Sequence, residues 1–188
     1  MPVKGREHGS GDLLEAAGKI KLLAFDVDGV LTDGRITYAS SGEEIKSFDV
    51  RDGHAVKMAF RAGLEVAIIT GRESSIVQRR ADELGIRLVY QGAKDKGQVL
   101  SSLLSRTGLA PHQISYMGDD VVDLPVLQAV GLSAAPADAV PEVVQRVAMV
   151  TEAKGGSGAA RELILFVLKA QGLYGKIMER YGLHDTAG

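Results

Sequence analysis

The sequence contains no cysteine, which excludes disulfide bonds, thiolate catalysis and cysteine-ligated zinc or iron–sulfur sites. Its four histidines are scattered and form no pair at the spacing that places two ligands on one helix face. Any metal ion that the chain binds is therefore expected to have oxygen ligands.

An excess of one charge and long apolar runs are also absent. The 22 basic and 24 acidic residues nearly cancel, so no general field attracts nucleic acid or an anionic membrane. No apolar run approaches the roughly 20 residues that cross a bilayer. The opening residues, "MPVKGREHGSG", lack the apolar centre of a signal peptide. We therefore expect a cytoplasmic protein with neither a nucleic acid nor a membrane as its partner.

The length and composition fit one domain with short additions at its ends. With 188 residues, 45% of them hydrophobic, the chain has enough apolar material for a sizeable core. We expect a loosely attached extension at 1–19 with a short helix at Asp12–Ala17, a domain at 20–171, and a tail at 172–188. The tail contains "YGKIMERYGL", a short amphipathic piece expected to dock on its own domain or on a neighbour.

Apolar strand-like runs alternate with helix-like segments along the domain. The expected strands are "IKLLAF", "LEVAIIT", "IRLVY", "QISYMG", "LSAA" and "VAMVT". The expected helices between and after them end at Gly85, Gly108 and Gly131, or span Pro141–Arg146 and Ala159–Ala170. This alternation predicts an α/β fold with a doubly wound, Rossmann-like parallel sheet.

One insertion interrupts the alternation after the first strand. The segments "RITY" and "EIKSFDV" alternate in polarity around "ASSGE", which predicts a β-hairpin that turns near Gly42. The following segment, "DGHAVKMAFRAG", predicts a helix capped by Asp52 and ended by Gly63.

Two carboxylates follow the first strand in "LLAFDVDGVLTDG". Residues i and i+2 of an extended segment face the same way, so Asp26 and Asp28 are expected to enter one crevice. Two unpaired carboxylates there are costly, and a divalent cation with oxygen ligands, such as Mg²⁺, relieves the repulsion. The simpler interpretation is turn chemistry, because Asp-Gly is common in turns.

Three later strand ends carry groups that suit a phosphoryl ligand. Thr70-Gly71-Arg72 offers a hydroxyl and backbone amides, although Thr70 could be only a helix cap. Lys96 lies near a helix start, where a lysine suggests a local anion, although most single lysines are solvated. The segment "MGDDVVD" supplies Asp119 and two further acids, or an acidic helix cap.

Together these segments resemble the haloacid dehalogenase superfamily of phosphotransferases, in its branch without a large cap domain. The resemblance covers 20–171, on "DVDGVLTDG", "GEEIKSF", "VRDG", "AIITGR", "YQG" and "YMGDD". It implies that Asp26 attacks phosphorus and forms an aspartyl-phosphate, and that Asp28 serves first as acid and then as base. It also implies Mg²⁺ held by the Asp26 carboxylate, the Asp28 backbone carbonyl and Asp119. Thr70 and Lys96 would bind the transferring oxygens, with Asp120 and Asp123 in supporting roles.

Within the superfamily, the chain resembles phosphatases that act on an eight-carbon sugar-acid phosphate in lipopolysaccharide sugar synthesis. The implied contacts with sugar or phosphate, some of them to a molecule bound in an adjacent subunit, are Asp28, Asp49, Val50, Arg51, Asp52, Gly53, Lys57, Arg72, Arg80 and Lys96. Arg51 and Arg72 favour the eight-carbon acid over a nine-carbon, sialic-type acid. Some relatives have Asn in place of Asp49 and Arg in place of Lys57, and another small phosphate ester remains an alternative.

The short insertion has a consequence for assembly. The residues between Gly34 and Phe60 supply only a hairpin and a helix, and relatives without a cap close the site with a neighbouring subunit. The resemblance thus implies a homotetramer with the hairpin at its interface. Two rival interpretations are a phospho-accepting receiver domain and a silent structural oligomer. The D-x-D spacing and "GDDVVD" disfavour the first, and the full set of expected catalytic positions disfavours the second.

Overall fold

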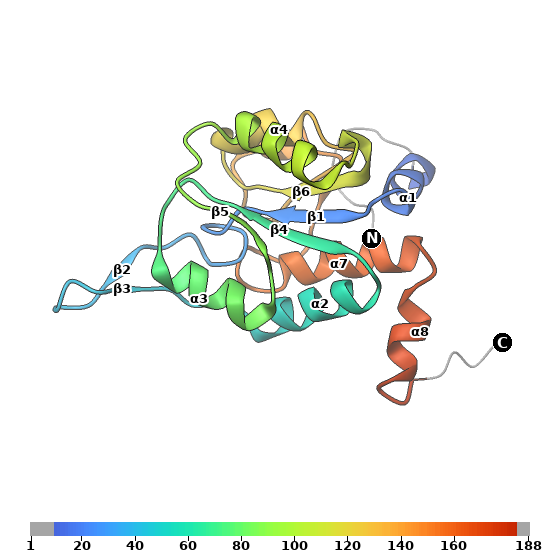
Figure 1. Cartoon of the computed structure of the whole chain (residues 1–188), viewed down its shortest axis with the longest axis horizontal. Coiled ribbons are helices and arrows are strands. Elements are labelled where there is room, and N and C mark those ends of the chain that lie inside the picture. Colours follow the sequence, from blue (N-terminus) through green and yellow to red (C-terminus); the bar gives the residue numbers. More distant parts are fainter. Residues whose placement is uncertain (1–9, 184–188) are drawn as a thin grey trace.

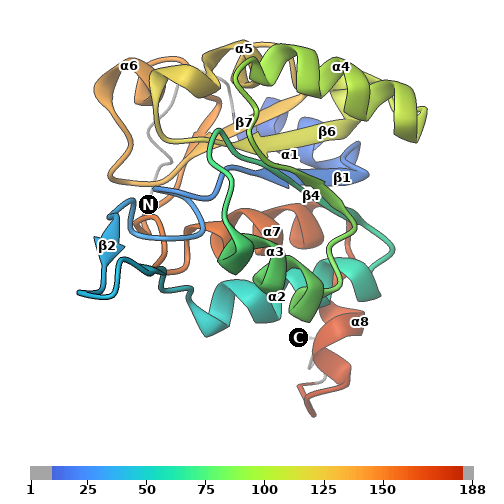
Figure 2. The same ribbon diagram turned by 60° about the vertical axis from the view of Figure 1, so that its left-hand side comes forward.

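A computed structural model describes residues 10–183, and a six-stranded parallel sheet forms its centre (Figures 1 and 2). The strand order is β5-β4-β1-β6-β7-β8. The strands are β1 (Leu22–Phe25), β4 (Glu65–Ile69), β5 (Leu88–Tyr90), β6 (Ile114–Met117), β7 (Leu132–Ala135) and β8 (Met149–Val150). The predicted doubly wound α/β fold is confirmed.

Helices cover both faces of the sheet, as Figure 2 shows. One face carries α1 (Ser10–Gly18), α2 (Val50–Arg61), α3 (Ser75–Leu84) and α7 (Ala159–Ala170). The other carries α4 (Lys96–Thr107), α5 (Leu124–Leu127) and α6 (Pro141–Val144). Along β1, Leu23 and Phe25 enter the first core while Leu22 and Ala24 enter the second. A strand buried on both faces explains why "LLAF" is continuously apolar.

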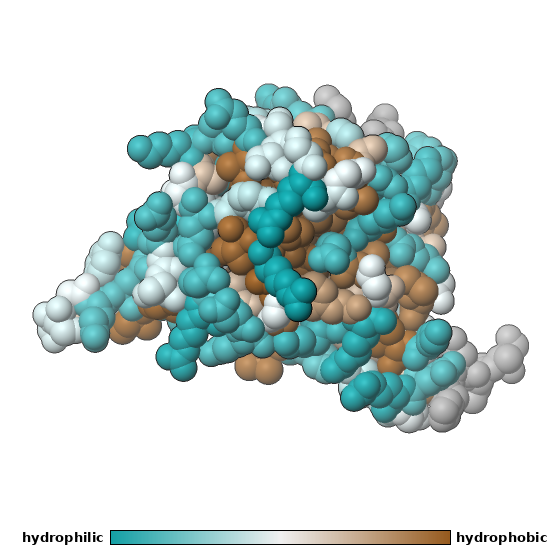
Figure 3. All heavy atoms as spheres, viewed as in Figure 1, coloured by the Kyte–Doolittle hydropathy of each residue, from teal (hydrophilic) through white to brown (hydrophobic). Residues whose placement is uncertain are grey.

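The predicted hairpin is present as a flap, residues 37–46, beside the sheet. It pairs β2 (Thr37–Tyr38) with β3 (Glu44–Ile45) in antiparallel register, and Gly42 in the turn has φ +86°. Figure 3 shows the flap projecting beyond the body of the molecule, with apolar residues along its lower edge in that view. Tyr38 and Ile45 are 62% and 49% exposed. The flap therefore presents apolar surface that the described chain leaves uncovered.

The two ends of the described chain pack against the domain. In α1, Leu13 and Ala17 are buried, and the Gln171 amide donates hydrogen bonds to the carbonyls of Ala17 and Ile20. Residues 10–18 are thus packed more tightly than the loose attachment expected of them. In α8 (Tyr174–Glu179), Ile177 is buried, so this part of the tail docks on its own domain. Residues 1–9 and 184–188 of the expected extension and tail lie outside the described residues.

Helix boundaries differ from expectation in several places: α1 spans Ser10–Gly18 and not Asp12–Ala17, and α6 ends at Val144 and not at Arg146. Asp49, and not Asp52, caps α2, because its carboxylate accepts a hydrogen bond from the Arg51 amide at 2.6 Å. Asp52 is buried and accepts from the amides of Gly158 and Arg161 at the start of α7. The helix α5 ends at Leu127 and does not extend to Gly131. Among the described residues, no helix has the length and apolar character of a membrane span.

Candidate active site

The carboxyl ends of three neighbouring strands bring the predicted catalytic groups together. Asp26 follows β1, Thr70 follows β4, and Asp119 lies two residues after β6; these strands are adjacent in the sheet. A cavity of about 430 Å³ opens at this edge. Its lining comprises Asp26, Asp28, Gly34, Thr70, Gly71, Arg72, Ala93, Lys94, Lys96, Asp119, Asp120 and Val122. Ligand sites of doubly wound sheets lie at this edge.

Lys96, the first residue of α4, provides a buried positive charge in this cavity. It is only 4% exposed, and its ammonium lies 3.0 Å from Asp26 Oδ2 and 2.6 Å from Asp123 Oδ1. Burial alone would lower the pKa of Lys96, but the two carboxylates together raise it. The ammonium therefore stays charged beside Asp26, where an anionic group is expected to bind.

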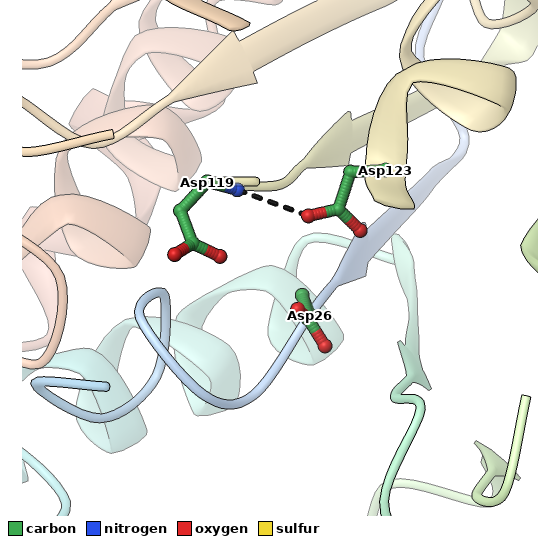
Figure 4. Close-up of side chains that lie close together, drawn as sticks. All are labelled: Asp26, Asp119 and Asp123. Atoms are coloured by element: carbon green, nitrogen blue, oxygen red, sulfur yellow. Dashed lines mark hydrogen bonds between the residues drawn. The ribbon is translucent and has the colours of Figure 1, made fainter. Parts of the chain in front are cut away.

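Asp123 is a fully buried anchor for the surrounding groups. Its Oδ1 accepts hydrogen bonds from Lys96 and from the Tyr116 hydroxyl, both at 2.6 Å. Its Oδ2 accepts from the amides of Asp119 and Asp120 at 3.1 and 3.3 Å, and Figure 4 shows the first of these bonds. Because both oxygens are occupied, Asp123 is suited to orienting Lys96 and the loop after β6. Tyr116 was not predicted, since a buried strand tyrosine looks like core in the sequence.

Asp26 and Asp119 have the free oxygens that a cation site requires. The Oδ1 atom of each is buried without a hydrogen-bond partner. One oxygen from each of Asp26, Asp119 and Asp123 lies within 4.8 Å of the others (Figure 4). Burial, together with the charges of neighbouring carboxylates, raises the pKa of Asp26 to about 6 and that of Asp119 to about 7. These oxygen donors fit a hard divalent cation such as Mg²⁺.

The loop after β1 approaches Asp119 closely enough to require glycine. Gly29 has φ +89°, and a Cβ atom there would lie 2.1 Å from Asp119 Oδ2. The backbone of "DVDG" therefore packs directly against the carboxylate of the later "GDD" segment. This contact joins two motifs about 90 residues apart in the chain.

Asp28 lies on the flap side of the cavity, between two cations. Its Oδ1 contacts the Lys46 ammonium, and its Oδ2 lies 3.8 Å from Arg72 Nε. Arg72 also donates a hydrogen bond to Glu44 Oε1 at 3.0 Å. Lys46 and Glu44 were not predicted as site residues, because the polar pattern of a hairpin does not show which of its side chains contacts the end of a strand.

Most of the residues expected to bind substrate do not line this cavity. Among the residues expected to bind substrate, only Asp28, Arg72 and Lys96 belong to its lining. Lys57 donates a hydrogen bond to the Glu83 carbonyl, and Arg51 pairs with Asp49 at 2.7 Å. Asp49, Asp52, Gly53 and Arg80 instead line a narrower hollow between α2 and α3, and Val50 is 80% exposed.

A larger hollow of about 940 Å³ lies at the opposite edge of the sheet. Its lining includes Lys21, Gly63, Arg87 and His112. Within residues 10–183, the only group of three potential metal-ligating side chains is Asp26, Asp119 and Asp123. We therefore identify the smaller cavity as the candidate active site, because of the side chains that line it and not because of its volume.

Comparisons with known proteins find related hydrolases. Residues 88–163 match the family model of haloacid dehalogenase-like hydrolases. The chain is 47% identical over 163 residues, 87% of each protein, to the 3-deoxy-D-manno-octulosonate 8-phosphate phosphatase of Escherichia coli strain K12. The crystal structure of the Yersinia pestis phosphatase of that name matches with a TM-score of 0.86 at 44% identity, over 87% of this chain and 88% of that one.

A third relative carries ligands. The phosphatase of that name from Moraxella catarrhalis, solved in complex with magnesium ion, phosphate ion and a KDO molecule, matches with a TM-score of 0.90 at 37% identity. The match covers 92% of this chain and 99% of that one. Sequence identity over most of both chains, together with the shared fold, places the chain in a family: it belongs to the 3-deoxy-D-manno-octulosonate 8-phosphate phosphatases, among the haloacid dehalogenase-like hydrolases.

Proposed function

We propose that the chain hydrolyses 3-deoxy-D-manno-octulosonate 8-phosphate to the free sugar acid and phosphate, with Mg²⁺ as cofactor. One observation carries the proposal. The Asp26 and Asp119 carboxylates each keep a buried oxygen without a partner, in the cavity that also holds the Lys96 ammonium, at the sheet edge where substrates bind. The family membership of the chain supports the sugar-acid phosphate as the substrate.

Asp26 is the proposed nucleophile. Its carboxylate forms a bond to phosphorus while the bond from phosphorus to the sugar oxygen breaks, and Asp28 donates a proton to that oxygen. Asp28 then accepts a proton from the water that attacks the aspartyl-phosphate, which releases phosphate and restores Asp26. Thr70 and Lys96, both buried in the cavity, bind the oxygens of the transferring group.

Asp26, Asp119 and the Asp28 backbone carbonyl are the proposed Mg²⁺ ligands. The unpartnered oxygens of Asp26 and Asp119 support the first two. When bound, Mg²⁺ offsets the repulsion between the Asp26 carboxylate and the phosphate dianion. Asp123 keeps its partners Lys96 and Tyr116, and so holds the ammonium in place from the side of the sheet.

Arg72 is the proposed partner of the substrate carboxylate. It lines the cavity, its side chain is 43% exposed, and its guanidinium can bind a carboxylate through two parallel hydrogen bonds. In a substrate that carries both groups, the phosphate binds Lys96 and the carboxylate binds Arg72. A simple phosphate ester binds only Lys96.

We also propose a cytoplasmic homotetramer in which flaps meet neighbouring subunits. The exposed Tyr38 and Ile45 of the flap and the exposed Val50 support an interface in this region. Residues 49–53, Lys57 and Arg80 lie outside the cavity of their own chain, which is consistent with a role at a neighbour's site. A sugar phosphate is too highly charged to cross a bilayer unaided, so the enzyme is expected in the compartment where its substrate is made.

A phosphate-release assay over sugar-acid phosphates, with and without Mg²⁺, tests the proposed function. The eight-carbon substrate should have the highest kcat/KM, and chelation of the metal should abolish turnover. A higher kcat/KM for a nine-carbon sugar-acid phosphate, or full activity in a chelator, would contradict it.

A further inference from the structure

Four charged side chains close a ring at the mouth of the cavity. Lys46 contacts Asp28, Arg72 lies 3.8 Å from the other oxygen of Asp28, Arg72 bonds Glu44 at 3.0 Å, and Glu44 lies 3.5 Å from Lys46. Charges alternate around the ring. Two members come from the flap segment, one from the strand-end loop after β1 and one from the loop after β4.

Lys46 is the buried member of this ring. Its side chain is 1% exposed, whereas that of Arg72 is 43% exposed. A buried ammonium without anionic partners is strongly disfavoured, so Lys46 is held where Asp28 and Glu44 lie. Arg72, in contrast, can turn towards a substrate carboxylate without leaving a buried charge behind. When Arg72 turns, Lys46 remains as the fixed partner of Asp28.

From this geometry we propose that Lys46 is a positioning residue for Asp28. By holding Oδ1 it fixes the orientation of the carboxyl group that exchanges protons with the leaving oxygen and with the attacking water. The flap then contributes to catalysis, because it places the Lys46 ammonium against the Asp28 carboxylate. The inference rests on the proposed role of Asp28 as acid and base.

An aryl phosphate separates the two duties of Asp28. With p-nitrophenyl phosphate, the nitrophenolate leaves with its electron pair and needs no proton, so the step that forms the Asp26–phosphorus bond does not require Asp28. Hydrolysis of that bond still requires Asp28 to take a proton from water. Since kcat/KM reports the first step and kcat includes the second, a misplaced Asp28 lowers kcat and leaves kcat/KM almost unchanged.

The test compares the Mg²⁺-loaded wild type with Lys46→Met, Lys46→Arg and Asp28→Asn on this substrate. Lys46→Met should lower kcat about tenfold and change kcat/KM by less than about twofold, so that KM falls with kcat. Lys46→Arg should restore most of the lost kcat. Glu43→Gln is the matched control, because Glu43 is an exposed residue of the same hairpin whose carboxylate accepts a hydrogen bond from Ser41, and it should leave both constants unchanged.

Other outcomes overturn the proposal in distinguishable ways. An unchanged kcat in Lys46→Met removes any positioning role. Parallel losses in kcat and kcat/KM indicate a general structural role, and a raised KM at constant kcat indicates direct substrate contact; either contradicts the proposal. If Asp28→Asn itself lacks the split between kcat and kcat/KM, the acid–base role of Asp28 fails and the inference about Lys46 fails with it. If Asp28→Asn shows the split and Lys46→Met does not, only the inference fails.

Discussion

The Lys96 ammonium lies 3.0 Å from Asp26 Oδ2, and the two side chains are 3% and 9% exposed. This ion pair joins the end of β1 to the start of α4 inside the sheet edge. The pair accounts for two features of the site. The charged Lys96 ammonium stays next to Asp26, the proposed nucleophile. The ammonium also orients Asp26 Oδ2, while Asp26 Oδ1 is left without a partner.

Replacing Lys96 with methionine should destabilise the metal-free protein by about 3 kcal/mol. Asp26 and Asp123 then lose their shared cation while remaining buried, and an uncompensated buried charge is costly. Urea denaturation measures the change. Lys94→Met is the control for stability, because that side chain belongs to an exposed residue of the same strand-end loop. A change below about 0.5 kcal/mol would show that the ion pair contributes little.

The stability gained from Mg²⁺ should increase with pH. Burial raises the pKa of Asp119 to about 7 and that of Asp26 to about 6, from an ordinary value of 3.8. A carboxyl group whose pKa is raised on folding favours the folded state while protonated. Its contribution is therefore complete below about pH 4 and is lost as the pH rises through 6 to 7.

Because metal ligands must be deprotonated, Mg²⁺ binds better as these groups ionise. The Mg²⁺-induced rise in Tm should therefore be at least about 3 °C larger at pH 7.5 than at pH 5.5, measured by calorimetry. Asp119→Asn should remove most of this difference. If Mg²⁺ raised Tm equally at both pH values, the ionisation of Asp26 and Asp119 would not control metal binding.

Gly29→Ala should weaken Mg²⁺ binding and lower activity by at least about tenfold. The new Cβ atom would lie 2.1 Å from Asp119 Oδ2, so the carboxylate would have to move. Gly42→Ala is a matched control, because Gly42 has a similar φ of +86° but no atom within 4 Å of the place that a Cβ would occupy. The measurement is kcat as a function of Mg²⁺ concentration for both variants. Equal losses in Gly29→Ala and Gly42→Ala would show that backbone strain, and not the contact with Asp119, causes the loss.

Ile45→Glu should weaken the proposed assembly. The side chain is 49% exposed on the flap, and a carboxylate at that position would have to lose its hydration at a subunit interface. Sedimentation velocity should show a tetramer for the wild type and smaller species for the variant. A tetramer that persists in Ile45→Glu would exclude the flap as the main interface.

Much of the fold could be predicted from local patterns. The glycines that end α3 and α4, Gly85 and Gly108, have φ values of +81° and +68°, as expected for helix ends. The hairpin and α7 were also predicted, because polarity patterns and breakers define them locally. Asp26, Thr70 and Lys96 could be brought together because parallel strands end at one edge.

Contacts between distant segments were not predictable in the same way. Asp49 and Asp52 are both good helix caps in the sequence, and only the start of α7, about 100 residues later, decides that Asp52 serves a different helix. Lys46 was missed for the same reason: its partner Asp28 is 18 residues away across the flap. The sequence shows which groups are available, and the tertiary structure determines which of them meet.

The role of Asp26 as nucleophile is the central claim, and Asp26→Asn tests it most directly. The amide keeps the size of the side chain but cannot form the aspartyl-phosphate. Phosphate release from 3-deoxy-D-manno-octulosonate 8-phosphate, measured with saturating Mg²⁺, should fall by at least about 1,000-fold. Turnover within about tenfold of the wild type would contradict the account.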